Sequence, residues 1–246
     1  MDWRSQWGLV RSFLHYRLRP GRHRRLTDFY RPWIGADSLC FDIGAHLGDR
    51  VDAWRRLGAR VVAVEPQPLF RDLLMRRYRH DPRVRIEPVA LAEQPGRQTL
   101  WVSRRTPTVS TINPIWREAM AGSPRFRGVT WDTCCEVEVL TLDGLIARHG
   151  VPAFCKLDVE GAEAQVLAGL SHPLPALSFE YSPAALTGAI TCIGRLSVLG
   201  AYRFRRSVGE SLRWSGGWMT AEQMHADLDA LSPDAPAGDL YAERIA

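Results

Sequence analysis

The strongest constraint on the fold of this chain is a regular alternation of short apolar runs with amphipathic stretches. The apolar runs at 38–43, 60–64 and 84–88 are short enough to predict buried strands. Between them, residues 47–57 and 69–78 have the spacing of amphipathic helices. Strands separated by single helices favour a parallel sheet covered by helices on both faces.

The same alternation resumes in the second half of the chain. It predicts strands at 153–157, 176–179, 202–205 and 239–245, and helices at 162–170, 183–199 and 220–231. Right-handed crossovers then place the domain in the doubly wound α/β class.

A long polar segment interrupts the pattern between predicted strands at 98–102 and 136–140. Residues 104–133 are rich in Pro, Arg and Thr and too long for a plain connection, so we expect a lid or a binding loop. Its candidate acceptor contacts are Thr106, Ser110, Trp116 and Trp131. The alternative is that the aromatic residues are buried and hold the loop against the domain, without contacting an acceptor.

Composition fits one globular domain, with 246 residues, 46% hydrophobic and 24% charged. We find no secretory signal and no apolar run of the roughly 20 residues that a membrane span needs, so a cytoplasmic location is expected. Five cysteines without a CxxC pair predict neither a disulfide framework nor a zinc site.

The N-terminal segment is strongly basic. Eight arginines fall within residues 1–35, and apolar residues from Trp3 to Leu18 have helical spacing. We therefore divide the chain into a basic helical extension at 1–35 and a main domain at 36–246. Such an arm can contact nucleic acid, an anionic membrane surface or an acidic substrate, but a solvated arm is the favoured interpretation.

The first candidate site is the loop Asp42-Ile43-Gly44-Ala45-His46-Leu47-Gly48, which follows the first predicted strand. Open parallel sheets bind ligands at the carboxyl ends of their strands. Gly44 and Gly48 allow a tight turn and a close approach of the backbone. The loop lacks the middle glycine of the GxGxxG pattern that holds a dinucleotide pyrophosphate.

Two acidic residues near this loop favour S-adenosylmethionine (SAM) over a dinucleotide. Asp42 would repel a diphosphate, whereas it can accept hydrogen bonds from the ammonium group of SAM. Glu65 ends the second predicted strand, where an acid can accept both ribose hydroxyls of an adenosine. The glycines alone remain compatible with an ordinary turn.

The second candidate site follows the strand at 153–157. Here Lys156, Asp158 and Glu160 lie within five residues at the end of an apolar run. Glu163 has a structural explanation, because acids are favoured in the first turn of a helix. Lys156 is the only lysine among 32 basic residues.

In these motifs the sequence resembles the FkbM family of SAM-dependent methyltransferases. The resemblance rests on five blocks, Phe41–Gly48, Val64-Glu65-Pro66, Val89-Ala90-Leu91, Ser110-Thr111-Ile112 and Lys156-Leu157-Asp158-Val159-Glu160-Gly161-Ala162-Glu163. It implies the class I methyltransferase fold, a Rossmann-like doubly wound sheet of about seven mostly parallel strands. It also implies SAM as the cofactor and O-methylation of sugars or secondary metabolites.

The resemblance assigns roles to individual residues. Asp42, Gly44 and Gly48 would hold the methionine part of SAM and Glu65 the ribose, while Ala90-Leu91 would line the adenine slot. The expected cofactor-binding set is Asp42, Gly44, Ala45, His46, Gly48, Glu65, Pro66, Ala90 and Leu91. His46 departs from the family, which commonly has Asn at that place.

The expected catalytic residues, in order of preference, are Asp158, Lys156, Glu160 and Glu180. A carboxylate base for a sugar hydroxyl needs a pKa raised by burial. Lys156 either lowers the pKa of the acceptor, pairs with Glu160, or forms a strand-end salt bridge. Carboxylates cluster here, but no spacing typical of metal ligands predicts a metal site.

The leading hypothesis is therefore an O-methyltransferase acting on a small molecule or a glycan. An RNA or DNA methyltransferase that uses the basic arm is an alternative, disfavoured because no Asn-Pro-Pro-Tyr-like motif is present. A non-catalytic SAM-binding protein is a further alternative. Peripheral membrane contact through the arm stays open.

Overall fold

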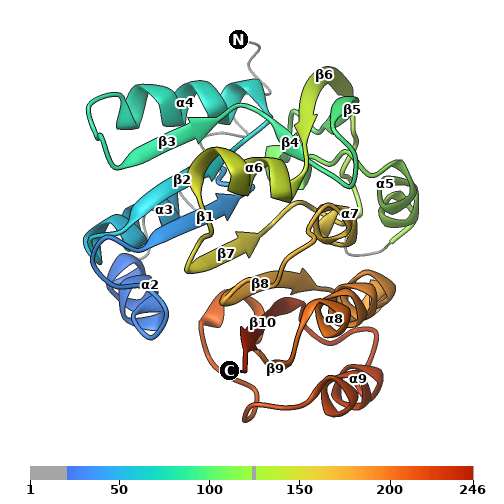
Figure 1. The fold of residues 1–246 in the computed structure, drawn as a ribbon. Coiled ribbons are helices and arrows are strands. Elements are labelled where there is room, and N and C mark those ends of the chain that lie inside the picture. The colour runs from blue at the N-terminus through green and yellow to red at the C-terminus, as the bar shows by residue number, and fades with distance from the viewer. Residues whose placement is uncertain (1–20, 124–125, 246) are drawn as a thin grey trace.

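The computed structural model describes residues 21–123 and 126–245, so the helix predicted near residues 3–18 lies outside the described residues. A seven-stranded sheet with the order β3-β2-β1-β7-β8-β10-β9 forms the centre of the molecule (Figure 1). Its strands are β1 (Leu39–Ile43), β2 (Arg60–Val64), β3 (Val84–Glu87), β7 (Phe154–Leu157), β8 (Ala176–Tyr181), β9 (Tyr202–Arg206) and β10 (Gly238–Arg244).

The chain changes direction across this sheet between β1 and β7. It first runs outward from β1 to β3, and it later returns to form β7 on the other side of β1. β1 pairs in parallel with both β2 and β7, whereas β10 is antiparallel to both of its neighbours. This confirms the predicted doubly wound sheet with mostly parallel strands, and it places a topological switch point at the end of β1.

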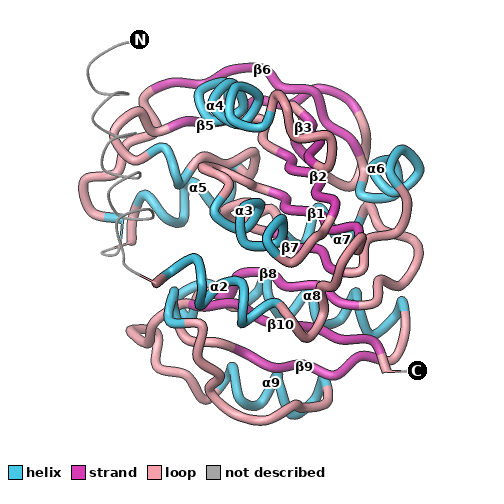
Figure 2. The backbone as a smooth tube through the Cα atoms, turned by 90° about the vertical axis from the view of Figure 1, so that its left-hand side faces the viewer, coloured by secondary structure: helices cyan, strands magenta, loops and turns pink. Residues whose placement is uncertain are grey.

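Helices cover both faces because the buried strands present apolar side chains on alternate sides. Phe41 and Ile43 belong to one core and Cys40 to the other. The first core is closed by α6 (Leu142–His149), α7 (Glu163–Ala168), α8 (Thr187–Leu199) and α9 (Ala221–Asp229). The second is closed by α2 (Arg22–Tyr30), α3 (Asp49–Arg56) and α4 (Pro68–Tyr78). In Figure 2 the strands follow one another down the molecule from β3 to β9.

A second, three-stranded sheet lies where β1, β2 and β3 end (Figure 1). It consists of β4 (Ala90–Leu91), β5 (Gly96–Val102) and β6 (Thr133–Leu140), in the order β4-β6-β5. The long segment between β5 and β6 contains a 3-10 turn, η1 (Pro107–Val109), and the helix α5 (Pro114–Ala121). Among the described residues, none of the helices has the length and apolar character needed to cross a membrane.

Candidate active site

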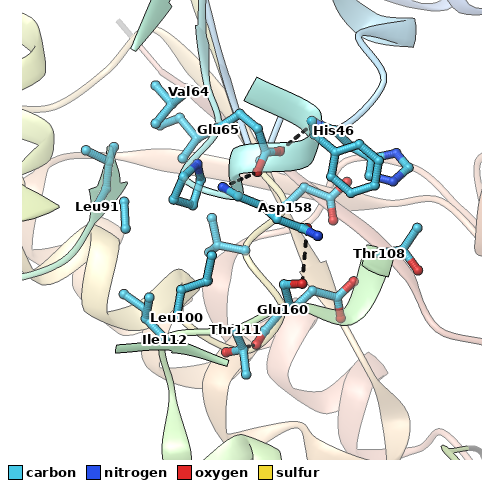
Figure 3. A pocket seen from close by; sticks show the side chains of 18 of the residues that line it. His46, Val64, Glu65, Leu91, Leu100, Thr108, Thr111, Ile112, Asp158 and Glu160 are labelled. Atoms are coloured by element: carbon cyan, nitrogen blue, oxygen red, sulfur yellow. Dashed lines mark hydrogen bonds between the residues drawn. The ribbon is translucent and has the colours of Figure 1, made fainter. Parts of the chain in front are cut away.

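A first cavity lies between the carboxyl ends of β1 and β2 and the segment that precedes α5 (Figure 3). Its lining includes six of the expected cofactor-binding residues, Gly44, His46, Glu65, Pro66, Ala90 and Leu91. Ala45 lines a neighbouring, larger cavity instead. Neither cavity is lined by Asp42, which is buried within β1, or by Gly48, which immediately precedes α3.

Glu65 holds its carboxylate at the end of β2 through two backbone donors. The N–H of His46 donates to Oε2 at 2.8 Å, and the N–H of Gln67 donates to Oε1 at 2.9 Å (Figure 3). Burial raises the pKa of Glu65 to about 7, although these two N–H groups oppose the shift. A carboxylate has about four acceptor positions, so oxygen lone pairs remain for a ligand.

The backbone of the first loop approaches β7 very closely. Gly44 has a φ of 84°, and a Cβ atom at this position would lie 1.9 Å from the backbone oxygen of Asp158. Only glycine fits such a contact. His46 also has a positive φ, of 49°, and Asn and His are among the residues that adopt this conformation most readily. The left-handed backbone at this place therefore suits His as well as Asn.

The side chain of His46 packs on Phe70, with the ring centres 3.9 Å apart. Burial lowers the pKa of His46 to about 4, so the imidazole is neutral at pH 7. Across the cavity lie Leu91, Leu100 and Ile112 (Figure 3). The site thus combines an apolar wall with a polar edge at Glu65. The sequence analysis gave Leu100 and Ile112 no role at the cofactor site, because they come from β5 and from the long segment after it.

Asp42 is a buried acid with no hydrogen-bond partner for either carboxylate oxygen within the part of the chain that the structure describes. It is 1% exposed and lies opposite Lys156 in the pairing of β1 with β7. Burial raises the pKa of Asp42 to about 6, and the guanidinium of Arg50 opposes this shift. A buried carboxyl group without a partner is unfavourable unless a ligand or water satisfies it.

A larger cavity of about 990 Å³ adjoins the first and shares Gly44, His46, Asp158 and Glu160 with it. Three of the expected catalytic residues, Asp158, Glu160 and Glu180, line this cavity. One carboxylate oxygen from each lies within 4.8 Å of the others, a spacing that can hold a metal ion. No ligand spacing in the sequence predicted this cluster, because Glu180 comes from a different strand, β8.

Lys156 requires a correction to the sequence analysis. Its side chain is 0% exposed and lines neither cavity, and its Nζ donates to Oδ1 of Asp239 at 2.5 Å. Of the three alternatives for Lys156, the structure shows a strand-end salt bridge and not the pairing with Glu160, because β10 brings Asp239 alongside β8 and within reach of Lys156. Burial works against the ammonium charge, but Asp239 and Asp158 raise the pKa of Lys156 above its ordinary value.

The carboxyl groups of the larger cavity differ in their ionisation. Burial opposes the charge of Asp158, but Lys156 and Arg50 keep the pKa of Asp158 below its ordinary value. Arg50 Nη1 lies 3.0 Å from Asp158 Oδ2. For Glu180, burial and the nearby carboxylates of Asp158 and Glu163 raise the pKa to about 8. Glu163 begins α7 as expected, and its Oε1 accepts the N–H of Val159.

The long segment between β5 and β6 forms the aromatic rim of the larger cavity. Trp116 and Phe126 line it, with ring centres 5.5 Å apart. Trp131 packs against both rings, and its Nε1 donates to the carbonyl of Val109 at 2.8 Å. Of the expected acceptor contacts, Thr106 and Trp116 line the larger cavity and Ser110 the smaller one. Trp131 instead anchors the segment.

The sheet order and the paired cavities at its switch point agree with the class I methyltransferase fold. A sequence model of the methyltransferase FkbM domain matches residues 42–188, more than half of the chain. The chain belongs to this family, whose cofactor is SAM. No curated protein matches the sequence.

Several solved structures resemble this chain at low sequence identity. The precorrin-6y C5,15-methyltransferase of Geobacter metallireducens shares 8% identity, with 91% of this chain and 87% of that chain covered and a TM-score of 0.48. A TehB-like SAM-dependent methyltransferase of Corynebacterium glutamicum shares 11%, with coverages of 96% and 95% and a TM-score of 0.46. An O-methyltransferase of Bacillus cereus, solved in complex with SAH, shares 11%, with 100% and 92% covered and a TM-score of 0.46.

Proposed function

We propose that this methyltransferase is an O-methyltransferase that acts on a hydroxyl group of a sugar, a glycan or a secondary metabolite. The observation that carries the proposal is the larger cavity, which adjoins the first at Gly44 and Asp158 and contains a carboxyl group with a raised pKa. A cavity of this kind can place an acceptor hydroxyl beside a base. Its rim residues Trp116 and Phe126 offer aromatic faces that suit a sugar ring.

The first cavity suits SAM in its chemistry. Glu65 would accept the ribose hydroxyls, and Ala90 and Leu91, together with Ile112, would enclose the adenine. The loop Gly44–Gly48, with Ala45, His46 and the unsatisfied carboxyl group of Asp42 behind it, would receive the methionine end. Pro66 would border the ribose. Bound SAM supplies an electrophilic methyl group on a sulfonium, and the protein has to orient the acceptor and remove its proton.

The cofactor assignment predicts that Glu65→Gln weakens SAM binding roughly tenfold or more, because a hydrogen bond to a charged acceptor contributes about 1.5–3 kcal/mol. The amide would present a donor where two backbone N–H groups already point. Isothermal titration with SAM above pH 8, where the raised pKa of Glu65 leaves the carboxylate ionised, measures the change. Glu138→Gln, at an exposed position on β6, is the matched control and should bind as the wild type does. Unchanged affinity of Glu65→Gln would refute the ribose assignment.

Glu180 is the base that the structure favours over Asp158. A general base works best when its pKa lies near the working pH, and Glu180 has a pKa of about 8. Asp158 is held ionised by Lys156 and Arg50, which makes it a weaker base and a better partner for a positive charge. Glu160 lies within reach of both carboxylates and would orient the acceptor.

This assignment fixes the direction of the pH dependence. The deprotonated carboxylate is the active form, so kcat should rise with pH and level off above an apparent pKa of about 8. Glu180→Gln should remove this rise and lower kcat by roughly 10²–10⁴-fold. Methyl transfer to a panel of glycosides and hydroxylated metabolites, followed by mass spectrometry, identifies a substrate for the measurement. A pH profile that Glu180→Gln leaves intact would rule Glu180 out as the base.

The charge of the larger cavity disfavours a nucleic acid acceptor. Its lining contains six acidic residues, Asp49, Asp158, Glu160, Glu163, Glu180 and Asp239, and three basic ones, Arg50, Arg105 and Arg127. Even with Glu180 protonated, the acidic groups of this lining outnumber the basic ones, and such a lining repels the phosphates that dominate nucleic acid binding. We therefore expect no methylation of RNA or DNA under conditions in which a glycoside or a metabolite is methylated. SAM binding without transfer to any acceptor would instead support a non-catalytic SAM-binding protein.

A further inference from the structure

The turn that follows β7 has an unusual backbone. Glu160 has a φ of 50° and Gly161 a φ of 86°, so two consecutive residues are left-handed and the first is not a glycine. A non-glycine residue adopts this conformation only where its surroundings hold it, and such residues concentrate at functional sites. The turn carries Glu160, which lines both cavities.

Three side chains from the segment before and within α5 contact this turn. The hydroxyl of Thr111 donates to the carbonyl of Glu160 at 2.8 Å, and Nδ2 of Asn113 donates to the carbonyl of Gly161 at 2.7 Å. The indole of Trp116 covers Gly161 so closely that a Cβ atom there would lie 2.1 Å from Trp116 Cγ. Both carbonyls of the left-handed turn are therefore bound by one short piece of chain.

The two donors are themselves fixed. Thr111 is 1% exposed and exchanges both backbone hydrogen bonds with Trp101 of β5, at 2.8 and 3.0 Å. Its hydroxyl also accepts the N–H of Asn113 at 3.0 Å. Asn113 in turn caps α5 by accepting the N–H of Trp116 at its Oδ1. The contacts to the turn thus come from a rigid segment rather than from a free loop.

We propose that Thr111 and Asn113 are positioning residues that hold the Glu160–Gly161 turn, so that the carboxylate of Glu160 joins those of Asp158 and Glu180. Thr111 also lines the first cavity. The same short segment therefore borders the proposed cofactor site and holds the Glu160 turn at the proposed acceptor site. The proposal rests on the acceptor function proposed for the larger cavity. It gives a chemical role to Thr111 of the Ser110-Thr111-Ile112 block, for which the sequence indicated none.

Two variants separate this role from general packing. Thr111→Val keeps the shape of the side chain but removes the hydroxyl, and Asn113→Asp keeps an acceptor that can cap α5 but removes the donor to Gly161. We expect each to lower kcat roughly tenfold while SAM affinity changes less than about threefold, the pattern of an interaction needed for the transfer step. Thr111→Ser should restore most of the activity.

Thr191→Val provides the matched control for removal of a threonine hydroxyl. Thr191 lies exposed on α8, and its hydroxyl donates to the carbonyl of Thr187 within the same helix. Its activity should equal that of the wild type. A double variant with Glu160→Gln gives the decisive comparison, because residues that act through one group have non-additive effects. Thr111→Val should have little further effect once Glu160 is replaced, and full additivity would overturn the proposal.

Hydrogen exchange of a peptide that spans residues 158–163 tests the same proposal without any acceptor. Exchange should be faster in Thr111→Val and Asn113→Asp than in the wild type and Thr191→Val, because the turn loses a carbonyl partner. Unchanged exchange would overturn the positioning role. If the wild type transfers no methyl group to any acceptor, the proposed function fails, while the exchange result still decides whether these residues hold the turn.

Discussion

Replacing Gly44 with alanine should abolish measurable SAM binding. The added Cβ would lie 1.9 Å from the backbone oxygen and 2.8 Å from the backbone carbon of Asp158. No side chain can move to relieve this contact, and the φ of 84° is itself unfavourable for alanine. β1 and β7 would have to separate where the N–H of Asp158 donates to the carbonyl of Ile43 at 2.9 Å. We expect a loss of affinity of roughly a hundredfold or more, since relieving the contact displaces the loop by about 1 Å or more, and a misplacement of about 1 Å in a site can have an effect of this size.

The strain should also lower the free energy of unfolding by about 1–3 kcal/mol. Gly194→Ala is the matched control, because Gly194 lies exposed in α8 and a Cβ atom there meets no heavy atom within 4 Å. Alanine favours a helix over glycine, so this control should be stabilised by up to about 1 kcal/mol and should bind SAM normally. Wild-type affinity in Gly44→Ala would show that the loop is not the cofactor loop.

Replacing Lys156 with methionine should destabilise the fold by about 3–5 kcal/mol, because it leaves a carboxylate without the buried cation that pairs with it. Lys156 is 0% exposed and bound to Asp239. Methionine fills a similar volume, so the expected loss comes from charge rather than from a cavity. Urea denaturation at neutral pH measures the difference. A loss below about 1 kcal/mol, as expected for an exposed ion pair, would contradict the buried pairing.

The double variant Lys156→Met, Asp239→Asn separates loss of the pair from loss of packing. Removing both charges should recover most of the stability, since replacement of a whole buried ion pair by neutral groups is often close to neutral. The two positions should therefore show strong coupling in a double-mutant cycle. If the double variant is less stable than Lys156→Met alone, Lys156 stabilises the fold by some other contact.

Much of the fold followed from the sequence because local patterns determine it. The apolar runs at β1, β2 and β7 predicted strands close to their observed limits, and helices between them required a parallel sheet. Once the sheet is parallel, the ends of β1 and β2 must lie side by side, so Gly44 and Glu65 could be brought together without a structure. The helix α6 was missed because it is short and only Thr141 separates it from β6.

The contacts that the sequence did not predict are those made across long stretches of chain. Lys156 meets Asp239 only because β10 inserts between β8 and β9, and no local pattern reveals this register. Likewise, Thr111 and Asn113 reach the turn at Glu160 from a segment that lacks regular periodicity. The separate sheet β4-β6-β5 escaped prediction for the same reason, since strand periodicity does not identify the partner of a strand.

The most direct test of the cofactor site is isothermal titration of the folded wild type with SAM, with NAD⁺ and Gly44→Ala as comparisons. The site described here predicts micromolar binding of SAM by the wild type, no detectable binding of NAD⁺, and no detectable binding of SAM by Gly44→Ala. Absence of SAM binding by the folded wild type, or equally tight binding of NAD⁺, would contradict it.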